Sequence, residues 1–354
     1  MALGVLAFYV GTNIYISVRL WKWSGLSGKR LSAVWGAVFL FLGSAFIVTE
    51  LWETMPDVFL YPLNLLGGYY VAAYIFLVIS VPIAHIVLGK EGGPMTTIVI
   101  ICAAAIFTLV GAISASRIMV KNYTVSTNKT DSFSIALVSD LHLGELIREK
   151  QLQNMIDAIN ALDADYVMIA GDVFDVGTDA LRNSDRAGEI FRTIKAPKGI
   201  YACLGNHDGG FRGLDDEAAE LLESWGITVL QDQVITVNGI NIAGRKDRGI
   251  QRMTPKELFK DTDTSLFTIV LDHQPFEMNA ERREGVDLIL SGHTHGGQIF
   301  PFTLVTKAIF RIDYGMLTED GCTMIVSSGL GTWGPRVRVG SRCEVVRIDI
   351  EKAE

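Results

Sequence analysis

The apolar residues of this chain are concentrated in its first third. Between Met1 and Ser116 the sequence has only nine charged residues, five basic and four acidic. A helix needs about 20 apolar residues to cross the hydrocarbon core of a bilayer. Four segments have suitable length and composition, at about residues 2–18, 32–48, 63–88 and 95–114. The sequence therefore predicts a bundle of about four transmembrane helices within residues 1–116.

The distribution of basic residues predicts how these helices are oriented. Loops rich in Lys and Arg stay on the cytoplasmic side of a membrane. Four basic residues follow the first segment, between positions 19 and 30, whereas the next connection carries acidic residues and no Lys or Arg. With four crossings, we expect a multi-pass cell membrane protein whose C-terminal part is extracytoplasmic. Arg117 and Lys121, just after the fourth segment, favour the opposite side.

Residues 117–354 have the pattern of one α/β domain. Short apolar runs such as DYVMIAGD (165–172) alternate with amphipathic segments such as IREKQLQNMIDAINAL (147–162). The first two strand-like segments, RIMVKNYTVST and SFSIALVSD, are separated by the turn-forming residues NKTD, so we expect a hairpin there. The mixture of hairpins and βα units predicts a two-sheet α/β sandwich, preceded by the transmembrane helices.

Charge and cysteine content argue against several function classes. Residues 117–354 carry 26 basic and 35 acidic residues, a balance that does not suit nucleic-acid binding. The four cysteines form no Cys-x-x-Cys pair, which argues against a thiolate zinc site or a redox motif. Cys322 and Cys343 are either free thiols, which we favour, or a disulfide in an oxidising compartment.

Five of the expected strands end in a polar cluster. These clusters are Asp140-Leu141-His142, Gly171-Asp172, Gly205-Asn206-His207-Asp208, Asp272-His273 and Gly292-His293-Thr294-His295. Ligands of open α/β sheets bind beyond the carboxyl ends of the strands. One Asp at a strand end is often a helix cap, and one His often packs in a core. Because five of the six histidines occur in these clusters, we expect all five clusters to meet at one edge.

The residue types in the clusters indicate which ligand gathers there. Carboxylates, imidazoles and an amide, without thiolates, suit Mn²⁺, Fe or Zn²⁺. Asp140 and His142, at i and i+2 of an extended segment, would point to the same side. The candidates are too many for one tetrahedral zinc and enough for two ions that share a carboxylate. Two divalent metal ions about 3.5–4 Å apart are the usual device for hydrolysis of a phosphoester substrate.

In this order, the clusters resemble the calcineurin-like metallophosphoesterase superfamily. Its pattern D-x-H, G-D-x-x-D, G-N-H-D, His and G-H-x-H reads here SDLHLG, GDVFD, GNHDGG, LDHQP and SGHTHGGQ. The metal ligands that the resemblance implies are, for one ion, Asp140, His142, Asp172 and His295, and, for the other, Asp172, Asn206, His273 and His293. It also implies attack by a hydroxide that bridges the ions, with His207 as general acid and Asp208 orienting His207.

The segment SSGLGTWGPRVRVGSRCEVVRI (327–348) resembles the membrane-anchored bacterial branch of this superfamily, some of whose members act on lipid-linked or cell-envelope phosphoesters. The resemblance implies a membrane-bound hydrolase of a phosphomonoester, phosphodiester or pyrophosphate bond, with membrane lipid as its surroundings. The apolar segment IFPFTLVTKAIF (299–310) is either a route for a lipid-linked substrate or an ordinary packed segment. The alternative function is a membrane sensor that binds a phosphorylated ligand. The complete set of expected ligands favours the enzyme.

Overall fold

The structure is a computed structural model that describes residues 2–52, 55–178, 181–210 and 215–353. It divides into two compact units. The first, which we call the helical unit, consists of Met1–Ser114 with Gly334–Val337. The second, the sheet unit, consists of Ala115–Trp333 with Arg338–Glu354.

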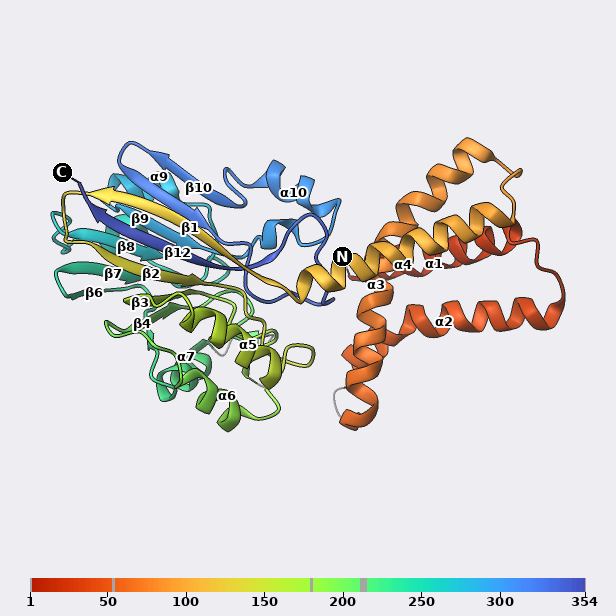
Figure 1. Cartoon of the computed structure of the whole chain (residues 1–354), viewed down its shortest axis with the longest axis horizontal. Helices are drawn as coiled ribbons and strands as arrows, with labels where there is room; N and C mark the ends of the chain where they lie inside the picture. Colours follow the sequence, from red (N-terminus) through yellow and green to blue (C-terminus); the bar gives the residue numbers. More distant parts are fainter. Residues whose placement is uncertain (1, 53–54, 179–180, 211–214, 354) are drawn as a thin grey trace. The chain divides into compact units, whose positions relative to one another are not determined.

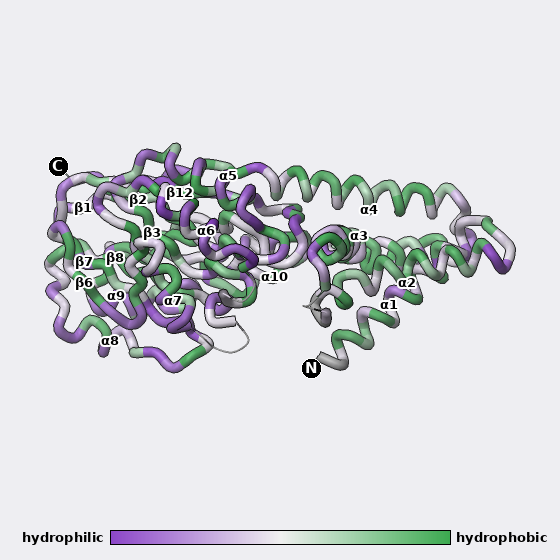
Figure 2. The backbone as a smooth tube through the Cα atoms, turned by 90° about the horizontal axis from the view of Figure 1, so that it is seen from below, coloured by the Kyte–Doolittle hydropathy of each residue, from purple (hydrophilic) through white to green (hydrophobic). Residues whose placement is uncertain are grey.

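The described residues of the N-terminal part form helices joined by short connections (Figure 1). Its helices are α1 (Ala2–Trp23), α2 (Lys29–Leu51), α3 (Asp57–Leu88) and α4 (Pro94–Ala115). In the described residues, three stretches are long and apolar enough to cross a membrane, namely Lys29–Thr49, Asp57–Leu88 and Pro94–Ala115. Figure 2 shows the hydrophobic colour that runs along α2 and α4. Helix α1 forms as expected but is not one of these three, so a fourth crossing stays a prediction.

Helix α1 packs into the helical unit through both apolar and polar contacts. Ile16 and Leu20 are fully buried. The Tyr70 hydroxyl of α3 donates to Asn13 Oδ1 at 2.5 Å, and the Trp35 indole of α2 donates to Ser17 Oγ at 3.1 Å. Polar side chains between apolar helices are satisfied by such interhelical hydrogen bonds. These contacts explain why Asn13 and Ser17, which weaken the apolar pattern, are compatible with a helix.

The sheet unit contains two sheets, as the sequence predicts, and each is a mixed sheet of six strands. In spatial order the first sheet consists of β1 (Ile118–Thr127), β12 (Cys343–Lys352), β2 (Phe133–Val138), β3 (Tyr166–Ala170), β4 (Ile200–Cys203) and β5 (Thr228–Val229). The second consists of β10 (Gly315–Glu319), β11 (Cys322–Val326), β9 (Leu288–Ser291), β8 (Phe267–Leu271), β7 (Ile240–Gly244) and β6 (Gln233–Val237). The helices of this unit are α5 (Glu149–Asn160), α6 (Ser184–Phe191), α7 (Asp215–Ser224), α8 (Pro255–Leu258), α9 (Met278–Arg283) and α10 (Phe302–Ile309).

Alternation along β2 shows how the layers pack. Ile135 and Leu137 belong to the core between the two sheets. Ala136 and Val138 point to the other face, where they pack in a second core with α5, α6 and α7 (Figure 1). Because successive strand residues face opposite sides, a strand buried on both faces is apolar throughout. The fold is therefore the predicted α/β sandwich.

All four cysteines are free thiols in this structure, which is the alternative that we favoured for Cys322 and Cys343.

The hairpin that we expected between the first two strands is wrong. Strand β12 lies between them, pairing Cys343 in parallel with Ile118 and Arg347 in antiparallel with Ala136. The five residues 128–132 therefore bridge two strand spacings, about 9.6 Å. Most side chains of β1 are exposed, which suits an edge strand, whereas β12 carries buried side chains on both faces. The local turn signal could not show that a distant apolar strand occupies the inner position.

Candidate metal centre

The five polar clusters come together at one edge of the sandwich. They follow β2, β3 and β4 of the first sheet and β8 and β9 of the second. Side chains that follow strands of the two sheets contact each other at this edge. The Oδ2 atom of Asp172, after β3, lies 3.0 Å from Nε2 of His273, after β8. The Nε2 atoms of His142, after β2, and His295, after β9, are 3.1 Å apart.

Asp140, His142 and His295 form one group of possible metal ligands. Each offers one donor atom, and these three atoms all lie within 4.8 Å of one another. The Nε2 atom of His295 is 3.5 Å from Oδ1 of Asp140. All three side chains are buried. The group therefore has two imidazoles and one carboxylate directed at a single point.

Asp172, His273 and His293 form the second group, with the same 4.8 Å limit between their donor atoms. The amide oxygen of Asn206 joins it, at 2.8 Å from Nδ1 of His293 and 3.2 Å from Nε2 of His273. Asp172 also belongs to the first group, because its Oδ2 lies 3.7 Å from Nε2 of His142. One carboxylate oxygen is thus within reach of both groups.

The spacing of these atoms fits two cations. Ligand atoms bound at about 2.1 Å, with angles of about 90–109° between them, are about 3.0–3.4 Å apart. Five of the donor–donor distances in the two groups are 2.8–3.5 Å. The structure thus brings together all seven residues that the resemblance implies as metal ligands. Which ion each of them binds stays a prediction.

The backbone at the ligands is in an unusual conformation. Five of the seven predicted ligands have a positive φ, namely Asp140 (53°), His142 (50°), Asp172 (53°), His293 (70°) and His295 (51°). Non-glycine residues rarely adopt this left-handed conformation, and where they do it is often at functional sites. Our argument from an extended segment was therefore wrong for Asp140 and His142. Their side chains converge because the chain turns left-handed at both residues.

Two glycines allow the ligand loops to approach each other. A Cβ atom on Gly292 would lie 2.4 Å from Oδ2 of Asp140, and one on Gly205 would lie 2.2 Å from Oδ1 of Asp172. Both distances are far shorter than a van der Waals contact, so a side chain at either position would displace a carboxylate. The glycines of the G-H-x-H and G-N-H-D motifs are therefore needed because only a residue without a side chain fits against these carboxylates.

Hydrogen bonds behind the imidazoles fix their orientation. The Nδ1–H of His273 donates to the carbonyl oxygen of Ala170 at 2.8 Å. Nδ1 of His142 lies 3.0 Å from Oδ1 of Asp175, which together with His142 and His207 forms a third group of possible donor atoms. In both rings the Nε2 atom is left to face the site. Metal-binding histidines commonly have such a partner on the other ring nitrogen.

His207 lies beside the two groups, but Asp208 does not orient it as we expected. Nδ1 of His207 is 2.6 Å from the carbonyl oxygen of Asp175. The buried carboxylate of Asp208 instead accepts backbone N–H groups of Asp172, Phe174 and Gly205 at 2.7–2.9 Å. Adjacent residues point in different directions here, so sequence neighbourhood gave the wrong partner. Asp208 holds the loop that carries Asp172.

The site is a cluster of buried charges whose pKa values move in opposite directions. Burial raises the pKa of Asp172, but the nearby His273 and His142 outweigh it and hold this pKa below its usual range. Burial lowers the pKa of His273, yet the carboxylate of Asp172 outweighs this and raises it to about 10. Burial and His273 lower the pKa of His293 to about 4. Asp172 and His273 therefore form an ion pair that a cation would have to replace, with release of a proton.

Sequence reasoning missed Arg338. This buried guanidinium donates to the carbonyl oxygen of His295 at 3.1 Å and to that of Gly331 at 2.7 Å, and it lies 3.2 Å from Nδ1 of His295. It therefore holds the loop that carries His295. The segment GPRVRVGS contains both Arg336 and Arg338, and nothing in the sequence pattern indicates which of the two contacts the site.

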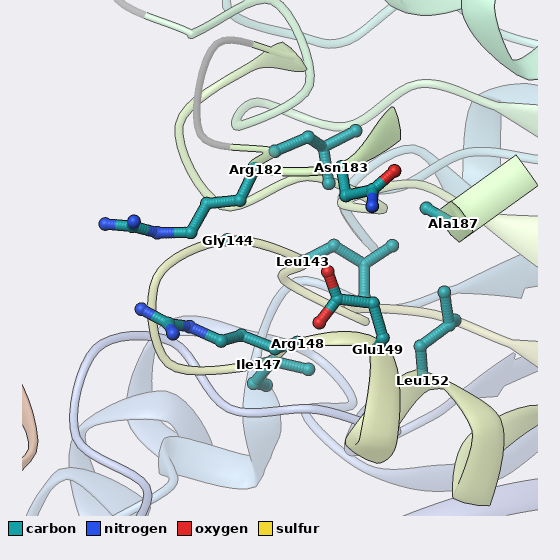
Figure 3. Close-up of a pocket in the computed structure, with 10 residues that line it drawn as sticks. Leu143, Gly144, Ile147, Arg148, Glu149, Leu152, Arg182, Asn183 and Ala187 are labelled. Atoms are coloured by element: carbon teal, nitrogen blue, oxygen red, sulfur yellow. The ribbon is translucent and has the colours of Figure 1, made fainter. Parts of the chain in front are cut away.

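A small cavity elsewhere in the sheet unit has no part in the metal centre (Figure 3). Its volume is about 20 Å³, room for about one water molecule. Figure 3 shows Arg148 and Arg182 at its rim, pointing in the same direction. Both are paired with Glu145, at 3.1 Å and 3.0 Å respectively. The cavity is therefore too small for a phosphoester, and the positive charges of both arginines are already offset by Glu145.

Comparison with known proteins gives a consistent assignment. The family model for calcineurin-like phosphoesterases matches residues 133–297. An uncharacterized metallophosphoesterase of Aquifex aeolicus is 31% identical over 245 residues, which cover 66% of this chain and 91% of that protein. One of Helicobacter pylori is 30% identical, over 65% of this chain. A transmembrane protein with metallophosphoesterase domain from Danio rerio is 29% identical, over 75% of this chain.

The extent of these matches differs among the relatives. The aligned region covers 63% of the Helicobacter pylori protein and 64% of the Danio rerio protein, so parts of both lie outside the similarity. The Aquifex aeolicus protein, in contrast, is matched over nearly its whole length. The matched family region contains all five polar clusters in full. The chain belongs to the calcineurin-like metallophosphoesterase family.

Proposed function

We propose that the protein hydrolyses phosphoesters and that two divalent ions occupy the site. The observation that carries this proposal is the position of Asp172 Oδ2, within 3.0 Å of one imidazole and 3.7 Å of another that belongs to the opposite group. When bound, two such ions activate water and offset the charge of the phosphoryl oxygens. Mn²⁺, Fe and Zn²⁺ all suit this set of nitrogen and oxygen ligands.

The general acid in this proposal is His207. Its Nδ1–H donates to the carbonyl oxygen of Asp175, and this bond persists whether or not Nε2 carries a proton. The imidazolium form can therefore deliver the Nε2 proton to a leaving oxygen without turning its ring. A positioned acid of this kind typically accelerates a reaction about 10²–10⁴-fold.

A direct test uses the purified full-length protein with Mn²⁺ and paired chromogenic substrates, p-nitrophenyl phosphate and bis-p-nitrophenyl phosphate. Hydrolysis of either that requires added metal supports the proposal and separates monoesterase from diesterase. If metal is bound at two ions per chain and neither substrate is hydrolysed, the sensor function is the better explanation.

We further propose that the natural substrate is lipid-linked. Phe300 and Phe302, which follow the G-H-x-H cluster, are about half exposed, and Phe310 of the same segment lies 6.0 Å from His293 between ring centroids. We expect a Phe300→Ser, Phe302→Ser variant to lose at least about tenfold in kcat/KM for a long-chain phosphoester, because apolar contact area is removed. Turnover of p-nitrophenyl phosphate should stay close to that of the unchanged protein.

The matched control for this variant is Met253→Ser, because Met253 is equally exposed and belongs to another loop. It should alter neither activity. Equal losses on the lipid-linked and the soluble substrate would show that the two phenylalanines only support the fold. No loss on either would exclude this segment as a substrate route.

We also propose that the sheet unit is extracytoplasmic, because the basic residues between positions 19 and 30 favour the cytoplasm for their loop. Cys203, Cys322 and Cys343 are buried, so a cysteine placed at the exposed Glu351 in a Cys102→Ser background is the thiol to follow. A membrane-impermeant maleimide should label Glu351→Cys in intact cells. Labelling only after lysis would place the unit in the cytoplasm.

A further inference from the structure

Helix α10 presents its apolar side to the outside of the sheet unit. Its large exposed side chains, 47–59% accessible, are Phe302, Leu304, Val305 and Ile309. At about 100° per residue these side chains, with Ala308, fill a continuous arc of about 160°. Thr303 is buried, and Thr306 Oγ1 donates to Oδ2 of Asp313 at 2.7 Å, so the polar side of the helix faces the protein. Surface helices of water-soluble domains have the opposite arrangement.

The exposed apolar side chains of the sheet unit are concentrated here. Five of its thirteen large apolar residues that are exposed in the described part of the chain lie between positions 300 and 309. Lys307, also exposed, lies at the margin of the apolar arc. An apolar arc with a cation at its edge is the pattern of helices that lie in the plane of a membrane interface.

The connection to the membrane-spanning segment is at the same end of the sheet unit as α10. Only Ser116 and Arg117 separate the last residue of α4 from the first of β1, Ile118, a connection of at most about 11 Å. Ile118 pairs with Cys343 in β12. Four residues before Cys343, the carbonyl oxygen of Val339 accepts the backbone N–H of Phe300 at 2.8 Å. Val339 lies within about 14 Å of Cys343 along the chain, so α10 begins close to the point of attachment.

Side chains at the start of β1 agree with this placement. Met119 and Val120 are both about half exposed, on an edge strand that begins three residues after α4 ends. Apolar side chains are thus exposed at the attachment point and on α10, the two regions that the chain path brings to one end of the unit.

We infer that α10 lies in the interfacial region of the bilayer, with Phe302, Val305 and Ile309 among the acyl chains and Lys307 at the level of the headgroups. The inference rests on the membrane anchoring of the chain and does not require the proposed catalytic activity. Its consequence is positional. Phe310, directly after α10, lies 6.0 Å from His293 between ring centroids, so the inference brings the metal centre close to the membrane surface.

The test is a measurement of depth on the full-length protein in phospholipid nanodiscs. A nitroxide spin label is attached to Val305→Cys or Ile309→Cys in a Cys102→Ser background, and to Met253→Cys as the matched control. Collisions with oxygen, which dissolves in acyl chains, are compared with collisions with a water-soluble nickel chelate. We expect the oxygen-to-nickel ratio at positions 305 and 309 to be at least about fivefold higher than at 253.

The remaining outcomes overturn the inference in different ways. A ratio at positions 305 and 309 equal to that at 253 shows that α10 faces water. Protection from both reagents shows that α10 is covered by protein, such as a second copy of this chain. Neither result tests the proposed hydrolysis, because the measurement uses no substrate. Conversely, a protein that is inactive but has lipid-exposed labels at positions 305 and 309 would contradict the proposed hydrolysis and still support this inference.

Discussion

Replacing Asp172 by Asn is expected to lower kcat/KM for any phosphoester substrate at least about 100-fold, the upper range of the losses caused by outer-shell partners of a metal site. The reason is geometric, because Oδ2 of Asp172 lies within 3.0 Å of an imidazole in one ligand group and within 3.7 Å of an imidazole in the other. An amide is neutral and cannot offset the charge of two cations. Metal analysis of the purified variant should show fewer than two bound ions per chain.

The control for this substitution is Asp131→Asn. Asp131 makes an exposed ion pair with Lys352 at 2.8 Å, so the same change of charge there should leave activity and metal content unchanged. The backbone N–H of His207 donates to Oδ1 of Asp172, and the oxygen of Asn can accept that bond equally well. An Asp172→Asn variant that is folded, holds two ions and keeps full activity would contradict the proposed role of Asp172.

Replacing His207 by Ala is expected to lower kcat by about 10²–10⁴-fold for substrates with a poor leaving group, while both metal ions stay bound. His207 forms a third group of possible donor atoms with His142 and Asp175, but it is not part of the two ligand groups that Asp172 connects, so we expect its loss to leave both ions bound. The size of the effect should depend on the leaving group. An alkoxide needs a proton as it departs, whereas p-nitrophenolate is stable without one.

The measurement is therefore a series of phosphoesters whose leaving groups differ in basicity. For the His207→Ala variant, the slope of log kcat against leaving-group pKa should become steeper than for the unchanged protein. A uniform loss across the series would assign His207 to substrate binding instead of proton transfer. Loss of metal from the variant would show that His207 belongs to the ligands after all.

The sequence was sufficient to predict that the polar clusters meet. Each follows an apolar strand, and parallel strands such as β2, β3 and β4 place their carboxyl ends at one edge. What holds the clusters in place was not predictable in the same way. The left-handed backbone at Asp140 and His142 depends on contacts with another loop. Their backbone N–H groups donate to the carbonyl oxygens of Gly171 and Asp172, which directly follow β3.

Contacts between distant segments account for the other differences. Arg338 and His295 are 43 positions apart, and no local pattern connects them. Asp208 and His207 are adjacent, yet Asp208 binds the loop of Asp172 while His207 binds that of Asp175. Sequence motifs identify which residue types the chemistry needs. The packing of the loops decides which neighbour each residue has.

The position of β12 between β1 and β2 also determines when these two strands can pair during folding. Ile118 and Cys343 are paired although they lie 225 positions apart in the chain. While the ribosome is still synthesising the residues between them, β1 has already left the ribosome behind α4 but has no strand to pair with. Strand β2 then lacks its neighbour on one side. Contacts this far apart close slowly, because the loop between them must be ordered first. Strand β12, which is made after β11, thus pairs with the strand that directly follows α4, and until it does so β1 and β2 each have an unpaired edge with which another chain could pair.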